Sequence, residues 1–158
     1  MKYRIIVVMA AILWVGLAHA RHCHINRSIF QAIRAQGAGP LRLAEAAAFD
    51  WDHVYLFHPY TPRGEVCAIL RIDPVACKVA VWFESRDDDE MSLAFVRDGG
   101  LVRYHYHHRA TGDFTSAPHG QPIARRDAVF RIVADDAALG KARRYRLVQR
   151  PSGGAAAG

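Results

Sequence analysis

The chain has 158 residues, of which 51% are hydrophobic, and its 21 Lys and Arg exceed its 15 Asp and Glu to give a net charge of +6 with neutral histidines. This length fits one ordinary domain with a real hydrophobic core rather than several domains. No nucleotide-binding glycine loop is found, so no cofactor is expected.

The N-terminus has the organisation of a secretory signal. Lys2 and Arg4 precede an apolar run over residues 5–17, and residues 18–20 supply the small-x-small pattern that signal peptidase reads. The run is shorter than the ~20 apolar residues of a bilayer span. We therefore expect a signal peptide over residues 1–20, no transmembrane span after its cleavage, and a periplasmic or secreted protein.

The charge that remains after cleavage indicates the kind of partner. Residues 21–158 keep 19 Lys and Arg against 15 Asp and Glu, a net charge of +4. A modest positive charge in an exported protein favours an anionic envelope component, such as lipid head groups or polysaccharide, over nucleic acid.

The first half of the remaining chain contains one strong strand signal. Residues 21–35 have apolar side chains at helical spacing and predict a helix, whereas residues 41–48 fit either a short strand or a helical turn. Residues 52–57 are aromatic and β-branched with neither parity polar throughout, so we expect a central strand with both faces covered. Thr61 then reads as the N-cap of a helix over 63–71, with Pro62 at its first position.

The second half is typical of an antiparallel sheet. Apolar alternation predicts further strands at residues 77–84, 91–97, 101–108, 128–134 and 143–149. Asp98-Gly99-Gly100 is a hairpin signal between two of them. The Gly- and Ala-rich segment 151–158 predicts a disordered tail.

These elements predict a single α+β domain over residues 21–150. We expect a mostly antiparallel sheet of about five or six strands, with one or two short helices packed on one face.

All three cysteines follow the predicted signal peptide, in a compartment that permits disulfides. We favour a Cys67–Cys77 disulfide, because Cys67 lies at the margin of the apolar face of helix 63–71, while Cys77 shares strand parity with Val79 and Val81. The alternative is that both are buried thiols.

Strand parity also predicts a basic surface. If the tyrosines, Phe130 and Leu147 of the last strands face the core, six basic side chains face the other way: Arg103, His105, His107, Arg131, Arg144 and Arg146. Guanidinium groups suit carboxylate or phosphate, so an anionic ligand would bind on this exposed sheet face. The alternative is that it is the solvated face of an antiparallel sheet.

The histidine cluster at 105–108 supports a second hypothesis. In a strand His105 and His107 point the same way and would hold two positions around zinc or copper, in a metal-binding protein or an enzyme. No third ligand is fixed by spacing. The chain also lacks the Gly-x-Ser-x-Gly, His-Glu-x-x-His and Cys-x-x-Cys motifs, so no catalytic residue is assigned and an enzyme is the less favoured interpretation.

Residues 49–61 read Phe-x-Trp-Asp-x-Val-Tyr-x-Phe-x-Pro-Tyr-Thr, and an aliphatic strand with an Asp-Gly hairpin follows them. In these features the chain resembles a family of small exported bacterial proteins of unassigned function. A looser likeness to small envelope lipoproteins implies a partner protein. The resemblance implies a secreted or envelope protein and carries over no catalytic residue. Together with the lack of catalytic motifs, we therefore expect a non-enzymatic binding or envelope-associated domain.

Overall fold

The computed structural model describes residues 25–35, 39–135 and 144–150. The predicted signal peptide over 1–20 and the predicted tail over 151–158 lie outside the described residues. After a helix at residues 25–35, the N-terminal helix, come β1 (Pro40–Arg42), α2 (Leu43–Ala46), β2 (His53–Phe57), α3 (Arg63–Ile69), α4 (Pro74–Ala80), β3 (Glu90–Arg97), β4 (Gly100–His108), η1 (Arg109–Thr111), β5 (Ile123–Ala124), η2 (Arg125–Asp127), β6 (Val129–Asp135) and β7 (Arg144–Gln149).

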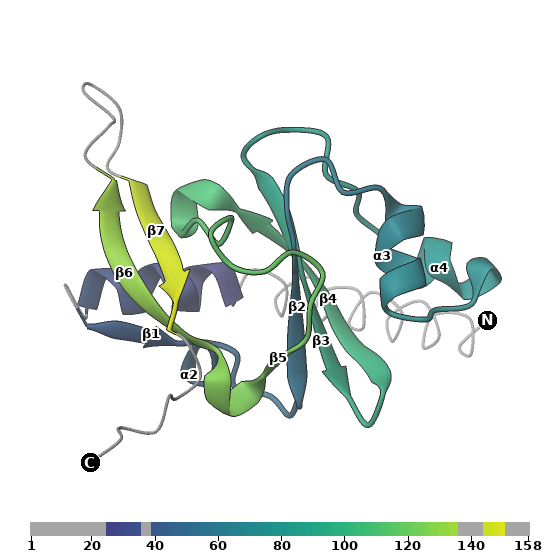
Figure 1. Ribbon diagram of the computed structural model, residues 1–158, viewed down its shortest axis with the longest axis horizontal. Coiled ribbons are helices and arrows are strands. Elements are labelled where there is room, and N and C mark those ends of the chain that lie inside the picture. The colour runs from purple at the N-terminus through teal and green to yellow at the C-terminus, as the bar shows by residue number, and fades with distance from the viewer. Residues whose placement is uncertain (1–24, 36–38, 136–143, 151–158) are drawn as a thin grey trace, which may run out of the picture.

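The strands of the described residues form two antiparallel sheets, with the orders β1-β6-β7 and β4-β3-β2-β5. The predicted α+β class with antiparallel strands is confirmed. The strands divide between two sheets because β6 pairs with β1 and β7 rather than with β3 or β4, which form a hairpin. Figure 1 shows the three-stranded sheet with the N-terminal helix at one end of the molecule and α3 and α4 at the other.

Strand β2 lies inside the four-stranded sheet and is covered on both faces, as its pattern predicts. Val54 and Leu56 belong to a core that also includes the apolar residues of the N-terminal helix and of the three-stranded sheet. Phe57 belongs to a second core, with residues of α3 and α4. The four-stranded sheet is therefore the middle layer, between the other sheet and the helix pair.

Aromatic side chains before β2 extend the first core towards the surface. The rings of Phe49 and Trp51 both meet the ring of Phe95 edge-on, with centroids 5.0 and 5.2 Å away. Arg103 covers Phe49 and Arg125 covers Trp51, with the guanidinium carbons 4.2 and 5.4 Å from the ring centroids. The aromatic row thus ends in an arginine at each side, an arrangement that cation–π attraction stabilises.

The prediction of a strand over residues 77–84 is wrong, because this segment begins inside α4. Asp73 caps that helix by accepting from the backbone N–H groups of Val75 and Ala76, and Pro74 follows at a first-turn position. Cys77 faces the core, whereas Val75 and Val79 are 86% and 82% exposed. The apparent alternation of apolar residues was one turn of helix with valines on its outer side.

The predicted cap of α3 is also displaced by one residue. Pro62 is the N-cap, and its carbonyl accepts from the N–H groups of Glu65 and Val66. The Thr61 hydroxyl instead donates to the carbonyl of His58 at 2.7 Å. Thr61 therefore stabilises the turn before the helix and not the helix itself.

A disulfide between Cys67 and Cys77 joins α3 to α4, with the Cα atoms 5.9 Å apart. The predicted pairing is confirmed, although its partners lie on two helices rather than on a helix and a strand. Both sulfurs are buried in the second core. The bond holds α4 to the rest of the molecule where two of its valines make no core contact.

Strand β4 forms one edge of its sheet, and two side chains bond its outward carbonyls. The Trp82 indole donates to the carbonyl of Tyr104 at 3.3 Å, and the Asn26 amide nitrogen donates to that of Tyr106 at 3.1 Å. Among the described residues, no helix is long and apolar enough to cross a membrane.

Removing the disulfide should destabilise the protein measurably. The bond closes a loop with a sequence separation of 10, for which the chain-entropy model gives about 3 kcal/mol. We expect the double variant C67S/C77S to lose about this much free energy of unfolding in urea titration. Cys23→Ser is the matched control, and an equal loss in that variant would contradict the assignment. Thiol titration of the unfolded wild type should find a single free cysteine.

Candidate functional site

The structure separates the six basic residues that strand parity grouped together. Arg131, Arg144 and Arg146 lie on β6 and β7 in the three-stranded sheet, while Arg103, His105 and His107 lie on β4 in the other sheet. A single basic face that spans all six is therefore not formed. The expectation depended on β4 being a neighbour of the later strands, but among the described strands β4 pairs only with β3.

His105 and His107 are buried, with 1% and 0% of their surface exposed, so the expectation that they face outwards is wrong. Their register partners are Leu93 and Met91, which belong to the first core. The reason is that β4 is covered on both faces: Tyr104, of the opposite parity, belongs to the second core.

Arg103 is the member of this group that reaches a cavity. It lies on the same parity as the two histidines but nearer the hairpin, and its guanidinium stacks on the ring of Phe49. A cavity of about 520 Å³ opens beside it, between β4, α2 and the N-terminal helix.

On the three-stranded sheet, the register gathers arginines on the outer face. In the pairing of β6 with β1 and β7, Arg131 lies between Pro40 and Val148, while Arg146 lies opposite Val133. Arg42 lies opposite Val129, and the ladder continues past β7, where the N–H of Arg150 donates to the carbonyl of Val129 at 3.0 Å. We call the four exposed residues the arginine face: Arg42, Arg131, Arg146 and Arg150.

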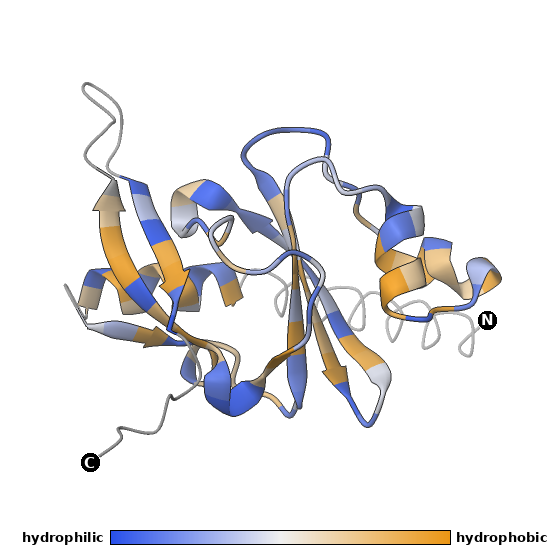
Figure 2. Cartoon of the chain, viewed as in Figure 1, coloured by the Kyte–Doolittle hydropathy of each residue, from blue (hydrophilic) through white to orange (hydrophobic). Residues whose placement is uncertain are grey.

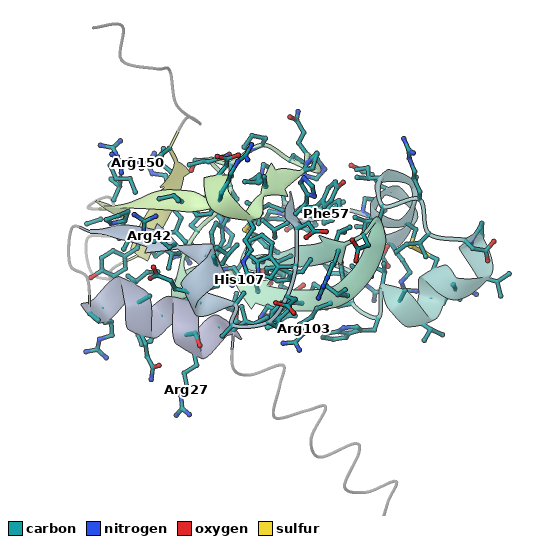
Figure 3. All side chains as sticks on the ribbon, turned by 90° about the horizontal axis from the view of Figure 1, so that it is seen from below. Arg27, Arg42, Phe57, Arg103, His107 and Arg150 are labelled. Carbon is teal, nitrogen blue, oxygen red and sulfur yellow. A yellow bond between two sulfur atoms is a disulfide. The ribbon has the colours of Figure 1, made fainter. Side chains whose placement is uncertain are left out.

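The arginines of this face occupy diagonal positions, and valines fill the positions between them. Arg131 is the diagonal neighbour of Arg42, Arg146 and Arg150 in the register. Side chains at such positions are about 7–8 Å apart. Figure 2 shows the hydrophilic bands of β7 beside the hydrophobic bands of β6, and Figure 3 shows Arg150 on the side of the sheet opposite the N-terminal helix.

Few carboxylates compete for these arginines. Arg42 lies 3.8 Å from Glu45 in an exposed pair, which contributes little. Among the described residues, no carboxylate forms an ion pair with the other three. Arg144 differs, because its two terminal nitrogens lie 3.1 and 3.3 Å from the two carboxylate oxygens of Asp89.

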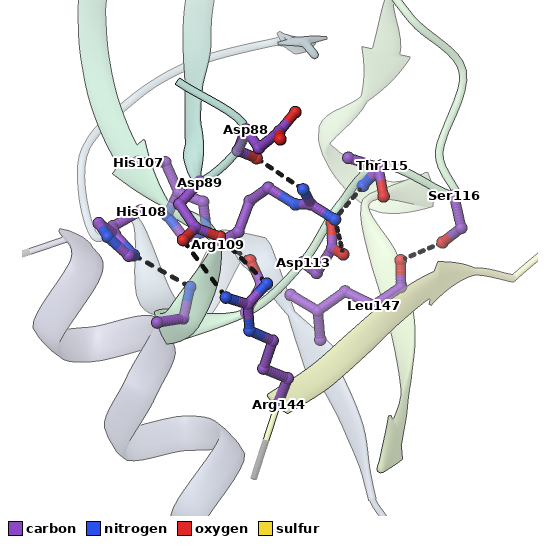
Figure 4. Close-up of polar contacts among 12 residues, drawn as sticks. Asp88, Asp89, His107, His108, Arg109, Asp113, Thr115, Ser116, Arg144 and Leu147 are labelled. Carbon is purple, nitrogen blue, oxygen red and sulfur yellow. Dashed lines mark hydrogen bonds and ion pairs between the residues drawn. The ribbon is translucent and has the colours of Figure 1, made fainter. Parts of the chain in front are cut away.

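The acidic turn over residues 86–90 is tied down by basic side chains (Figure 4). Arg109 donates to the carbonyl of Asp88 at 2.6 Å and to the carboxylate of Asp113 at 2.7 Å. Burial alone would raise the pKa of Asp113, but hydrogen bonds from Arg109 and Thr115 outweigh it and lower that pKa. This network, with the Arg144–Asp89 pair, joins β7 to the turn before β3 and to the segment after β4, and its role is structural.

His107 lies at the junction of three segments. Its Nε2 atom is 2.6 Å from the carbonyl oxygen of Gly112, and its Nδ1 atom is 2.6 Å from the side-chain oxygen of Asn26 on the N-terminal helix. A carbonyl oxygen and an amide oxygen both only accept, so the neutral ring with its proton on Nε2 bonds Gly112 alone, and the contact at Nδ1 becomes a hydrogen bond only when that nitrogen is protonated as well. Burial of the ring lowers the pKa of His107 to about 4, although the bond to Gly112 opposes the shift.

A second histidine pair links α3 to the loop before β5. His119 accepts from the backbone N–H of His58 through Nδ1 at 3.2 Å, so its Nε2 donates to the carboxylate of Glu65 at 2.9 Å. His58 lies 3.1 Å from the carbonyl of Ala117, and burial lowers the pKa of its ring. These contacts bind the loop to the helix and present no nucleophile.

The described residues hold no group of three His, Cys, Asp or Glu side chains with metal-binding geometry. Both ring nitrogens of His107 are engaged by Asn26 and Gly112. A metal at His107 would have to displace one of these two contacts.

Sequence reasoning missed Arg42, Arg150 and the cavity beside Arg103. Arg42 belongs to the segment whose structure was undecided, and Arg150 follows the last predicted strand. Arg150 keeps the parity of Arg146, so extending that strand by one residue would have found it. Comparison of the chain with models of protein families, with curated proteins and with solved structures finds no match.

The neutral, buried state of His107 predicts a pH-dependent stability. Its folded pKa of about 4 lies below the value of 6.5 for a solvated histidine, so the unfolded chain binds the proton more readily between these values. Stability should therefore be complete above about pH 6.5 and fall as the pH drops towards 4, by at most about 1.4 kcal/mol per pH unit for one proton. Urea titrations across this range measure the slope.

His107→Gln should flatten the slope, because glutamine keeps a donor for Gly112 and has no proton to gain. The exposed His53→Gln is the control and should retain the wild-type slope. If the His107 variant keeps the full slope, the titrating group is not His107.

Proposed function

We propose that this protein is a non-enzymatic exported domain that binds an anionic component of the cell envelope through its arginine face. The observation that carries the proposal is the register of β6, which brings Arg131 to the centre of three other exposed arginines. An exported location is supported by the disulfide, since such bonds persist in oxidising compartments. The resemblance to small exported proteins points the same way.

The geometry of the face favours a ligand with several negative groups. Guanidinium groups donate in a planar fork that matches phosphate or carboxylate. At diagonal spacings of about 7–8 Å, the long side chains of neighbouring arginines can contact successive negative groups of one larger ligand. The valines between them are half-buried and offer apolar contact to the ligand's uncharged parts. Phosphate groups of anionic lipid and carboxylates of an acidic polysaccharide share this chemistry.

The histidine alternative, a metal protein or enzyme, has less support. His107 is fully buried, its two ring nitrogens lie against Asn26 and Gly112, and the burial of its ring disfavours charge. A ligand that approaches from solvent would reach the arginine face first, since its side chains are exposed.

The proposal is tested by reversing charge on the face. We expect R131E/R146E to lose at least about tenfold in affinity for vesicles that contain phosphatidylglycerol, or for alginate, because each basic residue near an anionic surface contributes about 1 kcal/mol. Co-sedimentation with vesicles and titration calorimetry with the polysaccharide distinguish the two sources. Vesicles of phosphatidylcholine alone should not bind the wild type.

The matched control is R27E/R34E on the N-terminal helix, which changes the net charge by the same amount at two exposed positions. Figure 3 shows Arg27 pointing away from the three-stranded sheet. An equal loss of binding in the control would mean that the ligand responds to overall charge and would overturn the assignment to this face. Circular dichroism should show that both variants stay folded.

A further inference from the structure

A cavity of about 370 Å³ lies between the C-terminal end of α3, the turn after β3 and the loop before β5, and no residue of the arginine face lines it. Pockets for small molecules have volumes of about 300–1,000 Å³ and apolar walls with a few polar groups. The polar side chains of this wall are those of Arg71 and Tyr55, and its apolar side chains are Ile69, Leu70, Val96 and Pro122. Its volume and its wall therefore fit a small, largely apolar ligand.

Arg71 occupies a backbone position that favours glycine. Its φ is +54°, in the left-handed region that is costly for any residue with a side chain. Its N–H donates to the carbonyl of Ala68 at 3.2 Å, and the next N–H along the chain, that of Ile72, donates to the carbonyl of Cys67 at 2.9 Å. These two bonds form the Schellman motif that ends many helices, in which glycine is the usual residue at this position. An arginine held in this conformation points to a role for its side chain.

The guanidinium group of Arg71 is available to a ligand. The residue is exposed, and within the described ranges no carboxylate or carbonyl group bonds its side chain. Tyr55 is half-buried, and its hydroxyl has no hydrogen-bond partner in the same part of the chain. A guanidinium fork and a phenolic hydroxyl both donate, and a carboxylate accepts from both.

The apolar part of the wall is built on the second core. Tyr55, Ile69 and Leu70 pack against that core and stay half-buried, so part of each side chain remains accessible. The loop before β5 approaches α3 at Gly120, whose φ is +61° and where an added Cβ would lie 2.8 Å from a methyl carbon of Ile69. The N–H of Gly120 donates to the carbonyl of Leu56 on β2 at 2.9 Å. The cavity is therefore formed without a ligand.

We propose that this cavity binds a small aliphatic carboxylate. Arg71 and the hydroxyl of Tyr55 donate to its carboxylate group. Its hydrocarbon chain lies against Ile69, Leu70 and Val96. A single guanidinium balances one negative charge, which favours a carboxylate over a phosphate monoester with its charge of nearly two at neutral pH. The site uses no residue of the arginine face, so it stands or falls independently of the function proposed above.

An NMR titration of the protein with sodium octanoate, followed through the backbone amide signals, tests the proposal. We expect millimolar or tighter binding, with the largest shifts at the end of α3 and in the turn after β3. Octanamide and octylammonium chloride carry the same chain without the negative charge and should bind at least about tenfold more weakly. Sodium butyrate should also bind more weakly, because its shorter chain buries less apolar surface.

Arg71→Gly is the most informative variant, because glycine suits the backbone at this position. We expect a loss of at least about tenfold in affinity for octanoate. The melting temperature should equal or exceed that of the wild type, so the loss of binding would not come from unfolding. Arg71→Lys restores the charge without the fork and should recover part of the affinity. Tyr55→Phe removes one donor and should weaken binding by a smaller factor.

The matched control is Arg131→Ala, which removes one guanidinium from the arginine face and should bind octanoate like the wild type. Wild-type affinity in Arg71→Gly would overturn the proposal, because the carboxylate would then bind elsewhere. A loss of affinity in Arg131→Ala equal to that in Arg71→Gly would overturn it too, since octanoate would be responding to overall charge. Unchanged amide signals at millimolar octanoate would also overturn it.

Discussion

The contacts of His107 with Gly112 and Asn26 lie where the two sheets and the N-terminal helix meet, and they fix these elements relative to one another. From β4 the imidazole reaches the helix through Asn26, and its ring lies 5.1 Å from Phe114, which meets Phe130 of the three-stranded sheet at 5.0 Å. The backbone of Gly112 closes the junction at a φ of +139°, where an added Cβ would lie 2.8 Å from a methyl carbon of Leu147. Only glycine fits there, because a side chain would meet both strain and a clash.

The positions of strands could be predicted from the sequence where alternating apolar residues and turn residues determine them. Alternating apolar residues and the turn at Asp98 and Gly99 identified β3 and β4 nearly to their ends. The same reasoning failed at α4, because Cys77, Val79 and Val81 alternate in a way that fits a strand. The signal for a helix was the N-cap residue Asp73 with the proline that follows it. Because the disulfide attaches this helix to α3, its valines can remain exposed.

The candidate site shows that the alternation of side chains along a strand predicts which residues share a face, but not whether that face is exposed. Parity placed Arg131 and Arg146 correctly on one face, because β6 and β7 are true neighbours. It failed for His105 and His107, because alternation distinguishes two faces of a strand without saying what covers each. That information lies in pairings between residues far apart in the chain, such as Arg42 opposite Val129. Strand β1 has only three residues, which is too short for an alternating pattern to predict it.

The side-chain bonds to the outer edge of β4 bear on how this molecule meets its own copies. A nine-residue strand at a sheet edge is a template on which another chain can add a strand. The indole of Trp82 and the amide of Asn26 already occupy the carbonyls of Tyr104 and Tyr106, which point outwards from that edge. An incoming strand would have to break both of these hydrogen bonds before it could pair with β4. The side chains of Trp82 and Asn26 therefore oppose edge-to-edge aggregation.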